Sequence, residues 1–233
     1  MLNVLDFVFP VLLGIAVMVN VVMAVVLWKG QICPGQRRRL IKQGRGLTVL
    51  WLSTLAAGAF SLENSVLVFL VAVAGIAYEF SRHQPVRARN ALFASAIVGV
   101  FAFIAALFVL PAKAVMVVSL LTSGAAVTHT LMVSARCRLQ AFYRLLPATG
   151  LLGILAACAE AVRSALNVNL INAVSAQYAT AGALLMLAAA FVIWIWPEFS
   201  KEKPGLGRMA VVSAICVISN LFNGAINIGF NLL

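Results

Sequence analysis

Residues 33–45 read CPGQRRRLIKQGR, the most densely charged stretch of the chain. Apolar runs that are long enough to enter a bilayer lie on both sides of it. In proteins that cross a membrane several times, loops rich in Lys and Arg stay on the cytoplasmic side. This stretch therefore predicts on which side of a membrane the neighbouring apolar runs begin and end.

The composition is that of a membrane protein. Hydrophobic residues make up 64% of the 233 residues and charged residues 10%, with a mean hydropathy of +1.07. An ordinary soluble domain has roughly 25% charged residues, so lipid is the expected solvent of this chain. The net charge of +11 could indicate a nucleic-acid partner, but basic cytoplasmic loops account for it better. The four cysteines form no CxxC motif and predict neither a disulfide framework nor a metal site.

Eight apolar runs predict an all-α polytopic bundle that forms a single transmembrane domain over residues 1–233. The expected spans are about 4–28, 46–62, 65–80, 91–110, 114–135, 145–166, 173–196 and 209–233. Residues 29–45 and 81–90 are expected loops, and Pro147 suits the first turn of its helix. Of the 17 basic residues, 15 then fall on one face, against Lys113 and Arg163 on the other. This bias predicts that the basic loops are cytoplasmic and that both termini lie outside, in the periplasm.

Glu160 and Arg163 are one helical turn apart in the outer third of the expected span 145–166. An ionisable residue at that depth indicates a functional site, because its burial is costly unless it is paired or faces a polar cavity. The alternative is an ion pair within one helix, with Arg163 reaching outward to the interface. The sequence leaves both interpretations open.

Glu63, with Ser61 and Asn64, stands at the expected corner between spans 46–62 and 65–80. A carboxylate at the edge of the hydrocarbon can accept a proton from a lipid-soluble donor such as a quinol and release it to the outside water. The alternative is a solvated hairpin corner.

Two further polar features lie inside apolar runs. His129 is either a proton relay or ligand, or a neutral histidine whose hydrogen bonds are satisfied, and the second interpretation is favoured. Asn220, Asn223, Asn227 and Asn231 share one face of the last expected helix. They line a polar cavity or form a helix interface held by hydrogen bonds.

Several short motifs, in this order along the chain, resemble the membrane-anchor subunit family of dimethyl sulfoxide reductase. They are LWKG at 27–30, QRR at 36–38, RLLP at 144–147, IWPEF at 195–199 and the asparagine and glycine pattern of 220–229. The resemblance implies eight spans in a bacterial inner membrane and no tightly bound metal or haem in this subunit. It also implies partners in anaerobic respiration, namely an iron-sulfur electron-transfer subunit and a molybdopterin catalytic subunit.

The resemblance further implies that the chain oxidises menaquinol, as a substrate, near the periplasmic face. The family has a histidine where this chain has Ser61, so Glu63 is the expected catalytic residue, with Ser61, Asn64, Glu160 and Arg163 binding the quinol. Two other functions remain: a small-solute transporter or channel, lined by Glu160 and the asparagine face, or a purely structural subunit of a membrane complex.

Overall fold

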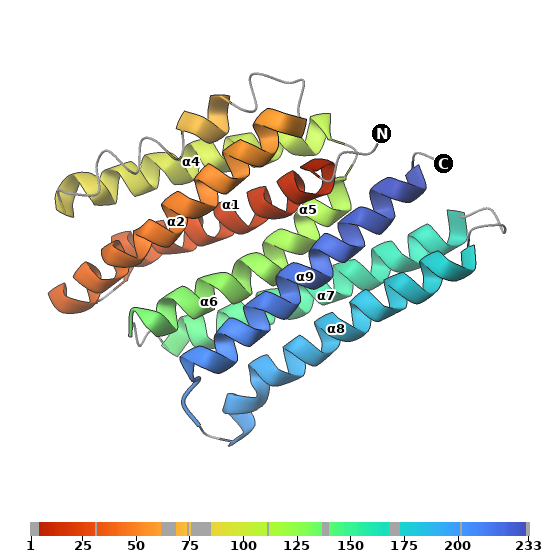
Figure 1. Cartoon of the computed structure of the whole chain (residues 1–233). Coiled ribbons are helices and arrows are strands. Elements are labelled where there is room, and N and C mark those ends of the chain that lie inside the picture. Colours follow the sequence, from red (N-terminus) through yellow and green to blue (C-terminus); the bar gives the residue numbers. More distant parts are fainter. Residues whose placement is uncertain are drawn as a thin grey trace.

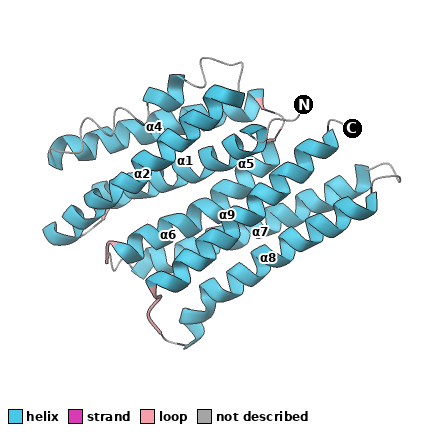
Figure 2. Ribbon diagram, in the orientation of Figure 1, coloured by secondary structure: helices cyan, strands magenta, loops and turns pink. Residues whose placement is uncertain are grey.

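The computed structural model describes residues 5–30, 32–61, 69–73, 75, 85–110, 112–136, 140–167, 173–200 and 202–231. Within these residues all regular structure is helical (Figure 2). The elements are α1 (Leu5–Lys29), α2 (Pro34–Ser61), α4 (Pro85–Val109), α5 (Lys113–Ser119), the π-helix η1 (Leu120–Gly124), α6 (Ala125–Ser134), α7 (Gln140–Asn167), α8 (Ala173–Ser200) and α9 (Leu206–Asn231). The all-helical prediction is confirmed for this part of the chain.

The helices run up and down, so their connections alternate between two ends of the bundle (Figure 1). The end of α1, the starts of α2 and α4, and the α6–α7 and α8–α9 connections share one end. We call it the basic end because exposed cations gather there: Lys29, Arg37, Arg38, Arg39, Lys42, Arg45, Arg87, Arg89, Arg136, Arg144 and Lys203. The start of α1 and the end of α9 lie together at the opposite end (Figure 1).

Six helical segments in the described part of the chain are long and apolar enough to cross a membrane. They are Phe7–Lys29, Arg87–Val109, Lys113–Ser134, Phe142–Arg163, Thr180–Ser200 and Leu206–Ile226. α2 is not among them, since five arginines and lysines occupy its first three turns. The expected span 65–80 lies largely outside the described residues. The prediction of several membrane-crossing helices is therefore confirmed at this coarser level.

The prediction that residues 29–45 form a loop is wrong for 34–45, which are the first three turns of α2. Pro34 is the first helical residue, where its missing N–H costs nothing. Leu40 and Leu47 are fully buried, whereas the arginines and Lys42 are exposed. This amphipathic pattern continues the helix beyond its apolar part.

Other helices also begin earlier than expected. α4 begins at Pro85, inside the expected loop 81–90, and α7 begins at Gln140, before the expected start of the span 145–166. Pro147 consequently lies two turns inside α7 and not in its first turn. In each case polar residues of good helix propensity extend an apolar span by one or two turns.

Glycines permit close helix contacts in the middle of the bundle. A Cβ atom on Gly14 would lie 2.5 Å from Ser119 Oγ, and one on Gly124 would lie 2.6 Å from Met18 Cβ. Met18 is adjacent to the midpoint of α1, so Gly124 marks the middle level of the bundle. Small residues at such contacts are what membrane helices need to associate.

The asparagine face of α9 begins in a helix interface. The Asn220 side-chain amide donates to Thr122 Oγ1 and to Ser123 Oγ, both at 2.6 Å, and all three residues are buried. Asn223 is buried as well, while the side chains of Asn227 and Asn231 lie outside the description. At Asn220 the face therefore packs against η1 through interhelical hydrogen bonds.

Candidate functional site

The corner expected around Glu63 is mostly outside the described part of the chain. Glu63 and Asn64 are not described, and Ser61 is the last residue of α2, without a described side chain. The catalytic assignment to Glu63 therefore stays a prediction from sequence.

Glu160 and Arg163 form an ion pair within α7. Arg163 Nε donates to Glu160 Oε2 at 2.8 Å, and Arg163 Nη2 donates to Oε1 at 2.5 Å. The Arg163 side chain is 65% exposed and that of Glu160 15%. In the described residues these two side chains bond only to each other, which is the arrangement expected of a pair that satisfies itself.

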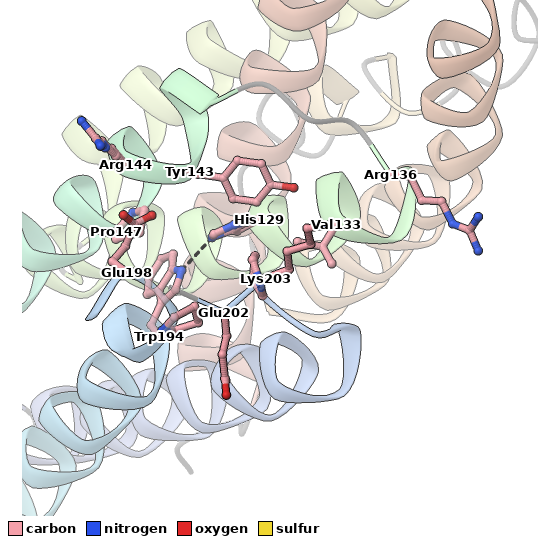
Figure 3. A pocket seen from close by; sticks show the side chains of 12 residues that line it. His129, Val133, Arg136, Tyr143, Arg144, Pro147, Trp194, Glu198, Glu202 and Lys203 are labelled. Carbon is pink, nitrogen blue, oxygen red and sulfur yellow. Dashed lines mark hydrogen bonds between the residues drawn. The ribbon is translucent and has the colours of Figure 1, made fainter. Parts of the chain in front are cut away.

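A cavity of about 820 Å³ lies at the basic end between α6, α7, α8 and the α8–α9 connection (Figure 3). Its inner wall is formed by aromatic and apolar side chains, and charged side chains line its outer part. The lining residues are His129, Val133, Arg136, Tyr143, Arg144, Pro147, Trp194, Pro197, Glu198, Glu202, Lys203 and Pro204. We call it the His129 cavity.

A buried hydrogen bond joins α6 to α8 in the wall of this cavity. Trp194 Nε1 donates to His129 Nδ1 at 2.7 Å, and the Tyr143 ring meets the imidazole edge-on with its centroid 5.1 Å away (Figure 3). Gly150 of α7 leaves room for the indole, because a Cβ atom there would lie 2.6 Å from Trp194 Cζ3. Three helices thus fix the position of the imidazole.

This hydrogen bond also fixes where the His129 proton resides. A neutral imidazole has one donor and one acceptor nitrogen. Because Nδ1 accepts the indole N–H, the proton of the neutral ring is assigned to Nε2. His129 Nε2 is buried and has no hydrogen-bond partner among the described residues. Four other buried side-chain atoms of the described residues share this property: Asn20 Oδ1, Trp51 Nε1, Arg208 Nη1 and Asn220 Oδ1. Each such group calls for an explanation, for example a bound water or a ligand; of these five residues, His129 is the one that lines this cavity.

The depth of His129 follows from the helix rise. It stands five residues beyond Gly124 in the direction of the basic end, about 7.5 Å from the middle level. Half of the hydrocarbon core is about 15 Å thick, so the imidazole lies inside the hydrocarbon. Arg136, Arg144, Glu198 and Lys203 are exposed near the ends of their helices or beyond them. The cavity therefore leads from an apolar interior to a charged mouth.

Two prolines line this cavity where α7 and α8 face each other. Pro147 and Pro197 both stand inside helices, and each removes one backbone N–H from the helical hydrogen bonds. At the mouth, Arg208 Nη2 donates to Glu202 Oε2 at 3.2 Å. No group of three potential metal ligands occurs among the described residues. The imidazole and the carboxylates of the cavity can form hydrogen bonds and exchange protons.

The sequence did not identify this site. His129 was expected to be a histidine with satisfied hydrogen bonds, and Nδ1 fits that expectation while Nε2 does not. Trp194 lies 65 residues further along the chain, so no spacing rule links the two. Two motifs of the sequence, RLLP at 144–147 and IWPEF at 195–199, contribute residues to the cavity.

A family model described as an integral membrane domain matches residues 6–223 of the chain. No curated protein and no solved structure matches the chain.

Proposed function

Since the chain belongs to a family of integral membrane domains, we propose that it is the quinol-binding membrane subunit of an oxidoreductase complex. The quinol headgroup binds in the His129 cavity. The observation that carries this proposal is a buried histidine in the wall of an aromatic-walled cavity, His129, whose Nε2 has no hydrogen-bond partner among the described residues. Quinols reach such a place from the lipid.

The cavity has the properties of a small-molecule site. Ligand pockets measure roughly 300–1,000 Å³ and combine apolar walls with a few fixed polar groups. At about 820 Å³ this cavity accommodates a naphthoquinone ring, with room for the first part of its apolar tail. The Tyr143 and Trp194 rings supply flat apolar contacts, and His129 supplies the polar one.

The side chains divide the work of binding and proton transfer. His129 Nε2–H donates to one oxygen of the headgroup and orients it, while Trp194 holds the imidazole in the required tautomer. Oxidation of a quinol releases two protons and two electrons. The exposed Glu198 carboxylate at the mouth accepts the protons one after the other and passes them to water. The electrons go to an iron-sulfur partner subunit and from there to a molybdopterin subunit.

The proposal includes a topology. The chain crosses a bacterial inner membrane eight times, with α2 and the run 65–80 added to the six spanning segments. Its termini lie in the periplasm, and the basic end faces the cytoplasm, as basic loops do. The quinol therefore binds near the cytoplasmic face, and its electron acceptor docks there. This differs from the periplasmic side that the family resemblance implies.

The sequence suggested a different quinol site, formed by Glu63, Ser61, Asn64, Glu160 and Arg163. The charged atoms of Glu160 and Arg163 form hydrogen bonds with each other. They therefore have fewer free hydrogen-bonding positions for a ligand than His129, whose Nε2 has no partner among the described residues. The contact geometry therefore favours the cavity as the binding site.

Titration of menaquinone-4 into the full chain in lipid nanodiscs tests the proposal. Quinones quench tryptophan fluorescence, and Trp194 lines the cavity, so binding should reduce the emission of the wild-type protein. We expect His129→Leu to raise Kd about tenfold, the value of one lost hydrogen bond. His129→Gln should recover most of this loss, because its amide can accept from Trp194 and donate to the quinone.

The Glu160→Gln variant is the control at the other end of the bundle. It should leave Kd unchanged. A wild-type protein that does not bind menaquinone-4, or a His129→Leu variant that binds it like the wild type, would overturn the proposal. Loss of binding in Glu160→Gln alone would return the site to the residues that the sequence suggested.

A further inference from the structure

Eight exposed cations lie at the basic end of α1, α2 and α4. The helices α2 and α4 lie on the other side of α1 from α6, α7 and α8 (Figure 1). We call these cations the basic surface: Lys29, Arg37, Arg38, Arg39, Lys42, Arg45, Arg87 and Arg89. The sequences of α2 and α4 contain no Asp or Glu. None of the eight cations forms an ion pair with a carboxylate of the described residues. The surface thus carries a charge that this part of the chain does not neutralise.

The level of the basic surface follows from a contact in the middle of the bundle. A Cβ atom on Gly99 would lie within 4 Å of both Trp51 and Val17, and Val17 is the middle residue of α1. Trp51 therefore marks the middle level of α2. Counting back along α2 at 1.5 Å per residue places Lys42 and Arg37 about 14 Å and 21 Å from this level.

These distances match the headgroup layer of a bilayer. The hydrocarbon ends about 15 Å from the centre, and the headgroups extend to roughly 20–22 Å. Arg45 begins deeper, at about 9 Å, and its long side chain can extend outward to the same layer. The cations of α2 therefore lie at the level of lipid phosphates.

Aromatic contacts on the neighbouring helices mark the same boundary. Trp28 is 59% exposed and packs edge-on against Phe93, with ring centroids 5.0 Å apart. Lys29 Nζ lies 5.5 Å from the centre of the Trp28 ring. Exposed tryptophan beside lysine is typical of the interface between hydrocarbon and headgroups. Lipid, whose headgroups occupy this level all around the bundle, is thus the natural occupant.

We propose that the basic surface binds the headgroups of anionic phospholipids in the membrane that surrounds the bundle. Juxtamembrane clusters of four to eight Lys and Arg attract anionic lipid in this way. Arginine forks pair with phosphate oxygens through two parallel hydrogen bonds, and Arg37, Arg38 and Arg39 offer three adjacent forks. The bound lipids would hold the first turns of α2 at the membrane surface.

Spin-labelled lipids test this proposal with the full chain reconstituted in phosphatidylcholine vesicles. The probes are phosphatidylglycerol and phosphatidylcholine, each labelled on the acyl chain, and the measured quantity is the fraction of label that the protein immobilises. We expect the wild type to immobilise phosphatidylglycerol several-fold more strongly than phosphatidylcholine. The preference should weaken at about 1 M salt, where charges are screened beyond about 3 Å.

Two matched variants separate charge from fold. R37Q/R38Q/R39Q should lose most of the preference for phosphatidylglycerol, whereas R37K/R38K/R39K, which keeps the charge, should retain most of it. Circular dichroism and menaquinone-4 binding establish that both variants are folded. The proposal is overturned if the wild type prefers neither lipid, or if the glutamine variant keeps the full preference. Either result would make an acidic protein partner the better occupant of this surface.

Discussion

Each end of the bundle holds a polar pair, and the two pairs differ in whether a hydrogen-bonding atom is left without a partner. Glu160 and Arg163 are neighbours on one helix, and their charged atoms bond to each other. His129 and Trp194 come from two helices, and their hydrogen bond leaves the buried His129 Nε2 without a described partner. The comparison teaches that a charged pair within one helix can satisfy itself, whereas a hydrogen bond between two helices can leave one atom of a buried ring without a partner.

Gly150→Val should cause the largest loss of stability and of menaquinone-4 binding, because the valine side chain would fill the space that Trp194 occupies. The new side chain would begin 2.6 Å from the indole, and overpacking of this kind costs about 1–3 kcal/mol of stability. Displacement of the indole should also abolish menaquinone-4 binding. The measurements are thermal unfolding in detergent and quinone titration in nanodiscs.

Gly182→Val is the control for this substitution. Gly182 lies on α8, and a Cβ atom there meets nothing within 4 Å, so neither stability nor binding should fall. If Gly150→Val behaved like Gly182→Val, the close contact between α7 and Trp194 would be wrong.

Trp194→Phe should have an intermediate effect. The phenyl ring keeps most of the packing, but His129 Nδ1 loses its donor, and a buried acceptor left unpaired costs about 1–3 kcal/mol. The imidazole is then free to carry its proton on either nitrogen, so menaquinone-4 affinity, measured by competition with a labelled quinone, should fall several-fold. Trp196→Phe, on the exposed face of the same helix, should change nothing; an equal loss in both variants would contradict the role of this hydrogen bond.

Glu160→Gln should have a small effect. The Arg163 side chain is largely exposed, and an ion pair between residues one turn apart on one helix contributes little to stability. We expect a thermal midpoint close to that of the wild type. A large drop in the thermal midpoint would show that Glu160 stabilises the bundle through more than its ion pair with Arg163. The contrast between the two polar pairs would then be wrong.

Glu63→Gln should have the smallest effect on quinone binding. If the headgroup binds in the His129 cavity, Kd for menaquinone-4 should equal that of the wild type in the same nanodisc titration. If Kd rises in Glu63→Gln and not in His129→Leu, the corner at Glu63 is the quinol site.

Periodic features of the fold could be predicted, and contacts between distant segments could not. Of the eight spans that the apolar runs predicted, six are found as candidate membrane-crossing helices among the described residues. The ion pair of Glu160 and Arg163 was one of the two interpretations that their helical spacing left open. The start of α2 was missed because charge was taken to indicate a loop, although Leu40 and Leu47 carry the period of a buried helix face. The hydrogen bond between His129 and Trp194 depends on how α6 and α8 each pack against α7, where Gly150 leaves room for the indole, and no single helix encodes this.

The five residues of η1 determine the direction in which His129 points. In a π turn each hydrogen bond spans one residue more than in an α-helix, so η1 contains one residue more than the α-helical turn that it replaces. In an ordinary α-helix each residue turns about 100° around the axis. Deleting one residue of η1 would therefore rotate α6 by about a quarter turn and carry the imidazole out of reach of Trp194. The π turn therefore sets the rotation of α6 relative to α5, so that α5 packs against α1 while His129 of α6 reaches Trp194.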